Sequence, residues 1–281
     1  SIPAVMWDGF ENAWPVLATG DAIVYINGYV GSYNGALQVT VNELTFPDTR
    51  EVDPFDFLKA APRDRDEMLN EFKQIVDSIE SEHLSALLQC ILGDQEYFKK
   101  FIVAPGGAKV HHDYLGGLLQ HTLEVARVCE TIASMYPKYV CRDLLITGAL
   151  LHDCGKIFQY SWENGILQTT DQGWLFGHIV MGAKYIDEKL KGCPNIPLHL
   201  KSELLHMIIA HHGKKEWGSP ETPQTINALG LHWADQISCN MNRFEEVTKE
   251  MLGDEALWKW HDKYLETRIY TGFVYDKNPP F

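Results

Sequence analysis

The spacing of apolar residues changes character near residue 64. Beyond that point apolar residues recur at intervals of three and four, which is the period of one face of an α-helix. A break at Pro105-Gly106-Gly107 divides the pattern into two blocks. The pattern therefore predicts a mainly helical fold. The predicted helices span residues 64–80, 82–92, 95–101, 117–135, 142–152, 178–190, 197–212 and 223–251.

The first 47 residues have the composition of β-structure instead. Residues 22–30 and 36–46 are rich in Val, Ile, Tyr and Thr and predict two strands. Asn34-Gly35 between them supplies the positive φ angles that a hairpin turn needs. A short strand at 4–7 and a helical turn at 10–17 are expected before the hairpin. Because so few strands cannot shield a core alone, either this sheet packs on the rest of the chain or further strands precede residue 1.

Composition places the chain among ordinary folded proteins. Apolar residues make up 45% and charged residues 22% of the 281 residues, and the apolar runs are far shorter than a membrane span. Six cysteines occur without a Cys-x-x-Cys pair, which argues against a zinc ribbon and against a disulfide framework. We therefore expect a soluble protein in the reducing cytoplasm and no membrane partner.

The charge balance limits how the chain can bind nucleic acid. A net charge of −14 argues against a protein that coats nucleic acid through bulk electrostatics. Residues 1–47 contain seven aromatic side chains but neither Lys nor Arg. This segment alone gives only weak support for RNA binding, because its aromatic residues are as well explained as core.

Histidine and aspartate form a spaced set in the second helical block. Ten of the twelve histidines lie between His111 and His232. Any one of them alone is more often a packed or surface residue than a metal ligand, but two aspartates also fall within apolar helical text, where an isolated carboxylate is costly. The set reads, in order, His121, His152, Asp153, His178, His211, His212 and Asp235.

This donor set indicates divalent metal. Imidazole and carboxylate without thiolate suit Mn, Fe, Zn or Ni better than calcium. Five imidazoles and two carboxylates exceed the needs of one tetrahedral zinc, whereas two ions sharing a bridging carboxylate would use all seven. Two such ions can activate water and stabilise an in-line displacement at phosphorus.

The sequence around these residues resembles that of a known family. The order H…HD…H…HH…D, centred on HDCGK, resembles the HD superfamily of metal-dependent phosphohydrolases. The surrounding stretches are similar to YhaM-type 3′–5′ exoribonucleases, which join an OB-fold domain to an HD domain. These stretches lie within residues 111–241 and read HHDYLGGLLQHTLEVA, LLITGALLHDCGKI, GHIVMGAKYI and AHHGKKEWGSPETP.

The resemblance implies two divalent transition-metal ions, with Mn or Fe favoured and Zn, Ni or Co as alternatives. Asp153 would bridge the two ions and so take part in catalysis. The first ion would be held by His121, His152, Asp153 and Asp235, and the second by Asp153, His178, His211 and His212.

Further residues are assigned to the substrate. The resemblance implies that Lys156 is catalytic and meets the scissile phosphate, although a solvated lysine at a helix end is an equally good reading of the residue alone. His111 and His112 would contact substrate or support the metal ligands. Lys214 and Lys215 follow the metal histidines in a loop that can meet a phosphodiester backbone, although a lysine pair in a loop is usually just solvated.

The resemblance also implies a division of the chain. A β segment at 1–47 resembles part of an OB-fold, 48–105 is a helical linker region, 106–271 is the HD phosphohydrolase domain and 272–281 is a C-terminal arm. Two departures bear on substrate preference more than on metal binding. Sequences of this type tend to carry LDAKM after the final aspartate, where this chain has ISCNM at 237–241, and an acidic residue where this chain has Asn227.

The expected activity is removal of nucleotides from the 3′ end of single-stranded RNA, or of DNA, by metal-activated water. The first alternative is an HD phosphohydrolase that acts on small nucleotides or cyclic dinucleotides. The second is a nucleic-acid-binding module with an inactive HD site, which the complete ligand set disfavours. The unpaired edge of the N-terminal sheet would also allow a homo-oligomer.

Overall fold

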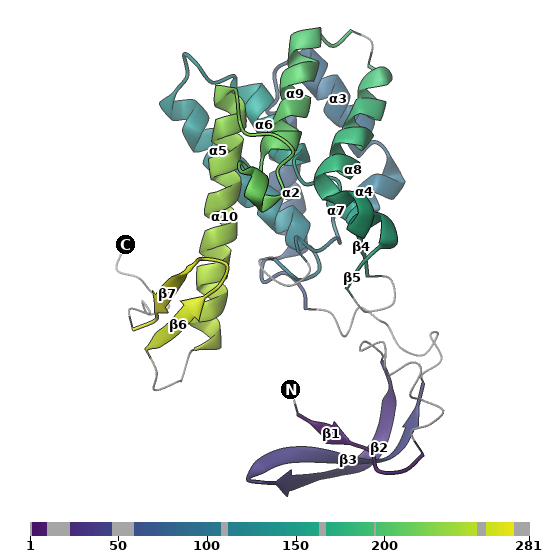
Figure 1. The fold of residues 1–281 in the computed structure, drawn as a ribbon. Coiled ribbons are helices and arrows are strands. Elements are labelled where there is room, and N and C mark those ends of the chain that lie inside the picture. The colour runs from purple at the N-terminus through teal and green to yellow at the C-terminus, as the bar shows by residue number, and fades with distance from the viewer. Residues whose placement is uncertain are drawn as a thin grey trace. The chain divides into compact units, whose positions relative to one another are not determined.

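The computed structural model describes residues 2–9, 23–46, 59–107, 112–162, 167–193, 195–251 and 257–272. The chain divides into two compact units, one formed by residues 1–59 with 161–168 and the other by residues 60–160 with 169–281. The second unit is helical (Figure 1) and contains every residue of the candidate metal set, so the mainly helical fold with small N-terminal strands is confirmed. Within the described ranges, no helix combines the length and the apolar character of a membrane span.

The helical unit follows the predicted periodicity closely. α8 (Asp171–Lys191) joins two helical segments across Gly177, whose φ of 68° is not helical. The helix expected at 178–190 matches the second segment, and the segment that begins at Asp171 was not predicted. The expected helix at 223–251 starts later, at Ile226, where the Thr225 side chain caps the first turn. The helices are α2 (Arg65–Asp77), α3 (Glu82–Leu92), α4 (Gln95–Phe101), α5 (Gly117–Met135), α6 (Arg142–Leu151), α7 (Lys156–Gln159), α8 (Asp171–Lys191), α9 (Leu198–Ala210) and α10 (Ile226–Glu250).

Short elements complete this part of the chain. A 3-10 helix, η2 (Lys215–Trp217), follows α9, and two-residue strands β4 (Tyr160–Ser161) and β5 (Gln168–Thr169) pair with each other. An antiparallel hairpin of β6 (Trp258–Asp262) and β7 (Thr267–Tyr270) follows α10. The periodicity of the sequence did not predict α7 or this hairpin.

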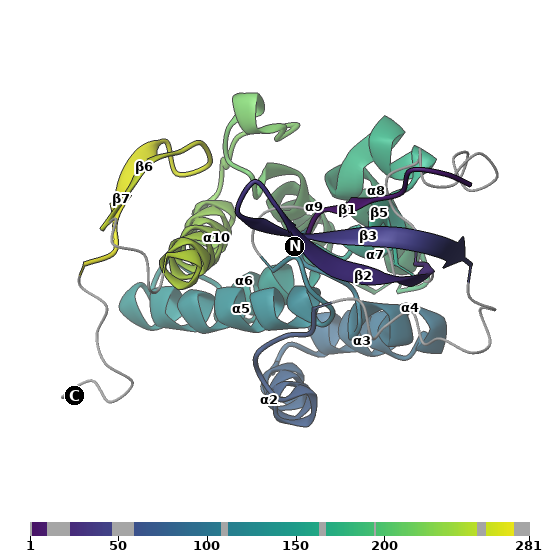
Figure 2. The ribbon, with the colours of Figure 1, turned by 90° about the horizontal axis from the view of Figure 1, so that it is seen from below.

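Helices α5, α6, α8, α9 and α10 form the packed centre of the unit. α5 packs against α6 and α10, and α9 packs against α6, α8 and α10; in Figure 2 α10 is viewed nearly along its axis and lies against α5, which crosses it. α6 is buried along its whole length from Leu144 to Leu151, which explains its continuous apolar text. A helix buried on every side leads its last residues into the interior, so the residues that follow α6 are also buried.

The turn between α6 and α7 lies against α8 at a point where two glycines meet. A Cβ atom on Gly155 would lie 2.0 Å from the carbonyl oxygen of His178 and 2.6 Å from the backbone nitrogen of Gly182. The φ angle of Gly155 is −70°, which any residue can adopt, so glycine is needed here for space and not for backbone freedom. The close approach sets the distance between the α6–α7 turn and His178.

The N-terminal unit is a small sheet with strand order β1-β3-β2. β2 (Tyr25–Tyr33) and β3 (Ala36–Thr45) are antiparallel, and β1 (Ala4–Val5) is parallel to β3. The turn is Asn34-Gly35, with φ angles of 52° and 81°, as predicted. The β2 tyrosines (Tyr25, Tyr29 and Tyr33) are exposed and do not form a core. The helical turn expected at 10–17 and the arm expected at 272–281 lie outside the described residues, apart from Gly272.

We expect Gly155→Ala to lower the free energy of unfolding by about 1–3 kcal/mol, because the added methyl group would push the α6–α7 turn away from α8. Chemical denaturation of the full chain measures this change. Gly230→Ala is the matched control, since Gly230 lies in the second turn of α10 and its Cβ would make ordinary contacts of 3.4–3.6 Å with Ile132 and Leu145. The control should stay within about 1 kcal/mol of wild type, and equal stability of the two variants would show that the approach at Gly155 is not tight.

Candidate metal centre

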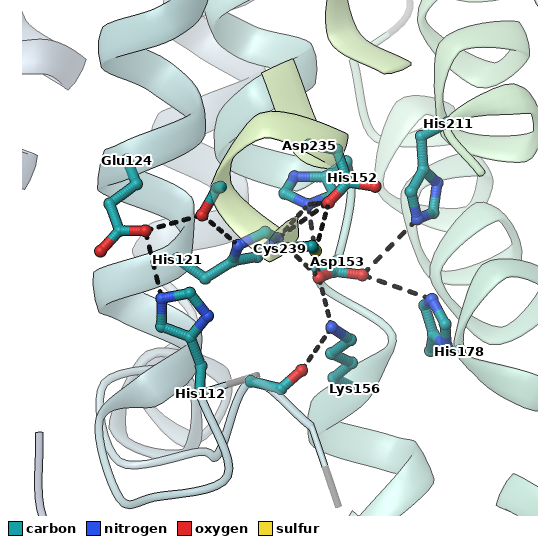
Figure 3. A network of polar contacts seen from close by, with 12 residues as sticks. His112, His121, Glu124, His152, Asp153, Lys156, His178, His211, Asp235 and Cys239 are labelled. Carbon is teal, nitrogen blue, oxygen red and sulfur yellow. Dashed lines mark hydrogen bonds and ion pairs between the residues drawn. The ribbon is translucent and has the colours of Figure 1, made fainter. Parts of the chain in front are cut away.

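The seven residues of the predicted metal set converge from five helices, and Figure 3 shows all of them except His212. His121 comes from α5, His178 from α8 and Asp235 from α10. The two adjacent pairs follow the C-terminal ends of α6 and α9, where a helix ends and its next side chains turn into the interior. Those pairs are His152-Asp153 and His211-His212.

Asp153 lies at the centre of the set, and its two carboxylate oxygens face different histidines (Figure 3). Oδ1 lies 3.3 Å from His178 Nε2 and 3.6 Å from His211 Nε2. Oδ2 lies 3.4 Å from His121 Nε2 and 3.3 Å from His152 Nε2. One carboxylate therefore joins two groups of imidazoles.

Asp235 completes the group on the Oδ2 side. Its Oδ1 lies 3.1 Å from His121 Nε2 and 3.8 Å from His152 Nε2, and the two imidazole Nε2 atoms are 3.1 Å apart. On the other side, the ring of His212 lies 4.5 Å from that of His211 and 5.1 Å from that of His178, between ring centroids. Ligand atoms of His178, His211 and His212 all lie within 4.8 Å of one another.

All five imidazoles are held in the same way, through Nδ1. His152 and His211 each donate Nδ1–H to the carbonyl oxygen three residues earlier, Ala149 O at 2.8 Å and Ile208 O at 2.6 Å. The remaining Nδ1 atoms also face oxygens, which fixes each ring with Nε2 as the available ligand atom. These oxygens are Ser238 Oγ for His121, Gln159 Oε1 for His178 and Trp217 O for His212.

A chain of hydrogen-bonded polar side chains supports the imidazole of His121. Ser238 Oγ donates to Glu124 Oε2 at 2.7 Å, so the hydroxyl oxygen is free to accept from His121 Nδ1 at 3.0 Å. Glu124 also receives Gln120 Nε2 at 2.9 Å and lies 3.2 Å from His112 Nε2. Burial raises the pKa of Glu124, but the hydrogen bonds from His112, Gln120 and Ser238 outweigh it and lower the pKa to about 2.

The two aspartates are ionised at neutral pH. Burial raises the pKa of Asp153, but the charge of Lys156 and the imidazoles of His152 and His121 hold that pKa well below its usual value. Burial likewise raises the pKa of Asp235, and the hydrogen bond with His121 outweighs it. The centre therefore contains two carboxylates in their ligand form.

Two of the candidate ligand imidazoles have a lowered pKa and are neutral at neutral pH, whereas one has a raised pKa. Burial lowers the pKa of His178 well below its usual value and lowers that of His212 to about 4. Burial also acts to lower the pKa of His121, but its hydrogen bonds with Asp153 and Asp235 outweigh burial and raise that pKa to about 9. A proton on His121 thus balances the carboxylates where a divalent cation would otherwise do so.

These atoms fit divalent metal. Among the described residues, three of the candidate ligand atoms are buried without a hydrogen-bond partner, namely Asp153 Oδ1, His178 Nε2 and His211 Nε2. Buried polar atoms are rarely left unsatisfied, so they point to a group that binds there. Imidazole nitrogens and carboxylate oxygens are suitable ligands for Mn, Fe, Zn, Ni and Co.

Lys156 is buried, which excludes the alternative of a solvated lysine at a helix end. Its side chain is 7% exposed, Nζ lies 2.6 Å from Asp153 Oδ2, and Nζ also donates to the carbonyl oxygen of Gly106. Burial lowers its pKa, but the charge of Asp153 outweighs this and keeps the pKa raised, so Lys156 carries a fixed positive charge.

The other residues that were expected to contact substrate occupy different environments. His111 lies outside the described residues, and His112 is fully buried beside Glu124, where it can support His121 but does not face solvent. Lys214 is exposed and its Nζ lies 4.2 Å from the centre of the Trp217 ring. Lys215 is exposed and pairs with Glu221 at 3.3 Å.

A cavity of about 620 Å³ opens onto Asp153, Lys156 and Asp235, within the range of small-molecule sites. One wall includes Arg243 of α10, and another includes Tyr264 in the turn of the β6–β7 hairpin. Sequence reasoning missed Arg243, Tyr264, Cys239 and the support of His121 by Glu124 and Ser238. The helical spacing of Ser238 and Cys239 from Asp235, three and four residues, was the one available signal.

The class of protein follows from this fold and from comparison with known families. The model of the HD domain family matches residues 118–240, a stretch that contains all seven candidate ligands. The chain is thus an HD-domain protein, and the expected enzyme class, a metal-dependent phosphohydrolase, is confirmed. No solved structure is significantly similar to the chain.

Two relatives narrow the family. The chain is 31% identical over 257 residues to the 3′-5′ exoribonuclease YhaM of Shouchella clausii (strain KSM-K16). The aligned region covers 89% of this chain and 77% of that protein. The chain is 28% identical over 253 residues to the 3′-5′ exoribonuclease YhaM of Geobacillus sp. (strain WCH70), covering 89% and 76%. The chain belongs to the YhaM family.

We expect Ser238→Ala to weaken Mn²⁺ binding by about 10- to 100-fold, because His121 loses the oxygen that holds its Nδ1 atom. Isothermal titration calorimetry on metal-free protein measures the affinity. Ser134→Ala, which changes an exposed serine on α5, is the matched control and should bind as wild type. Unchanged affinity in Ser238→Ala would show that this hydroxyl does not orient the ligand.

Proposed function

We propose that the chain is a 3′–5′ exoribonuclease that hydrolyses single-stranded RNA at a centre of two divalent transition-metal ions. The observation that carries the proposal is Asp153, whose two oxygens face two separate groups of imidazoles, each with Nε2 directed inward. His121, His152 and Asp235 would hold one ion with Asp153. The second would be held by His178, His211 and His212 with the same carboxylate.

Bound at these residues, the two ions would supply an activated water and charge stabilisation for hydrolysis of a phosphodiester. The residues of the chain provide the rest. Asp153 fixes the spacing of the two ligand groups, and Lys156 holds a positive charge beside it at the base of the cavity. Lys156 is therefore the group best placed to neutralise charge that develops on the phosphate oxygens.

The walls of the cavity suit a terminal nucleotide. Arg243 offers a second positive charge, held in place by Asp262 at 2.7 Å, and Tyr264 and Trp217 offer aromatic faces for a base. The exposed tyrosines of β2 are further stacking surfaces for a single strand. The relatives' activity, which is that of a 3′-5′ exoribonuclease, supports RNA as the substrate over small nucleotides.

Further features bear on the activity of the HD site, the location of the protein and the identity of the ions. The intact geometry of all seven ligands argues against an inactive HD site. All six cysteines are free thiols, which agrees with a cytoplasmic location. Mn and Fe remain the proposed ions.

We expect Asp153→Asn to reduce exonuclease activity at least about 100-fold, because it removes the carboxylate that serves both ligand groups. Lys156→Met should reduce activity by a similar factor while metal content stays at the wild-type level, because Lys156 is not a metal ligand. The assay follows a 5′-labelled single-stranded RNA with Mn²⁺ on a sequencing gel, where wild type should produce a ladder that shortens from the 3′ end.

Asp187→Asn is the matched control, since Asp187 is a carboxylate on α8 that pairs with Lys191 and Lys201 on the surface. It should cleave as wild type. If wild type leaves the RNA intact but hydrolyses a mononucleotide or a cyclic dinucleotide, the small-nucleotide alternative replaces the exonuclease. If Asp153→Asn cleaves RNA as wild type, the centre is not the catalytic site.

A further inference from the structure

A thiol faces the ligand group that contains His121 and Asp235. Cys239 lies four residues after Asp235 on α10, so the two side chains leave the same face of the helix. The Cys239 Sγ atom lies 3.4 Å from Asp235 Oδ1, to which it donates a hydrogen bond. The ligand atoms of His121, Asp235 and Cys239 all lie within 4.8 Å of one another.

The surroundings of this sulfur differ from those of the core cysteines. Cys239 lines the same cavity as Asp153, Lys156 and Asp235, whereas Cys129 and Cys154 are enclosed in packed interior. Among the described residues, Cys239 is the one cysteine that groups with potential metal ligands. The unsatisfied Asp153 Oδ1, in a side chain that is 3% exposed, indicates that a cation binds at this centre on the His178 side, and the other oxygen of the same carboxylate faces the group that Cys239 joins.

We propose that Cys239 is a thiolate ligand of the ion held by His121, His152 and the two aspartates. When the ion binds, the Sγ–H bond breaks, the proton passes to solvent and the sulfur electron pair is donated to the ion, with no change in oxidation state. This inference rests on the proposed metal centre and goes beyond it, because the centre alone needs only imidazole and carboxylate.

A thiolate changes which metals the centre prefers. Soft sulfur ligands favour Zn, Co and Fe(II), whereas carboxylate and water favour Mn and Mg. The ion on the Asp235 side would thus be selected by sulfur, and the ion on the His212 side by imidazole. The two sides of one centre would then differ in metal preference.

Cobalt reports directly on this ligand. Metal-free full-length protein is titrated with Co²⁺ under anaerobic conditions, and absorption is recorded from the near ultraviolet to the visible. We expect wild type to show visible bands of ligated cobalt together with a thiolate-to-cobalt charge-transfer band in the near ultraviolet. Cys239→Ser should keep the visible bands and lose the charge-transfer band. Cys90→Ser, which removes an exposed thiol on α3, is the matched control and should keep both.

Affinity gives a second readout that does not depend on activity. We expect Cys239→Ala to weaken Zn²⁺ binding by at least about 10-fold and to weaken Mn²⁺ binding less. Loss of a residue that only hydrogen-bonds to a metal ligand already weakens binding by about 10-fold or more, so loss of a ligand should cost at least as much. Thermal unfolding of the metal-free variants shows whether they fold. If Cys239→Ser does not fold, the comparison is made with Cys239→Ala.

The possible results separate this inference from the proposed function. Visible bands in wild type without a charge-transfer band would overturn the role of Cys239 and leave the metal centre standing. A charge-transfer band that persists in Cys239→Ser would also overturn it, because another thiol would be the ligand. Wild-type protein that shows no bands of ligated cobalt would overturn the metal centre and this inference together.

Discussion

Asp153 places a negative charge in the interior of a helical unit, where its residue is only 3% exposed. An ion buried at this depth without partners costs several kcal/mol of folding free energy. The structure offsets that cost with Lys156 on one side and with four imidazoles around it, one from the neighbouring residue His152 and three from other helices. The packing of α5 to α10 therefore has to bring these partners to one carboxylate, and the same convergence creates a site for divalent cations.

Local structure explains how the partners reach the carboxylate. α6 and α9 end in the same way, with a histidine that donates Nδ1–H to the carbonyl three residues earlier and so directs Nε2 inward. The backbone contact between Gly155 and Gly182 brings the turn after α6 close to α8 and its ligand His178. Helix ends supply acceptor carbonyls that the helix itself leaves unused, which makes them suitable places for oriented histidines.

Much of the fold and of the ligand set could be predicted from the sequence, because both leave regular signals. Long amphipathic helices repeat their apolar residues, and the spaced histidines and aspartates stand out in apolar text. The first turns of α8, before Gly177, and the β6–β7 hairpin left no such period. The same is true of Glu124 and Ser238, which come from different helices and become partners only after folding.

The central claim is that one buried carboxylate joins two metal sites. The most direct test is anomalous diffraction from crystals of the full chain grown with Co²⁺, recorded at the cobalt edge. The account predicts two peaks per chain, about 3.5–4 Å apart, with Asp153 Oδ1 facing one and Oδ2 facing the other. A single peak, or two peaks of which neither touches Asp153, would contradict it.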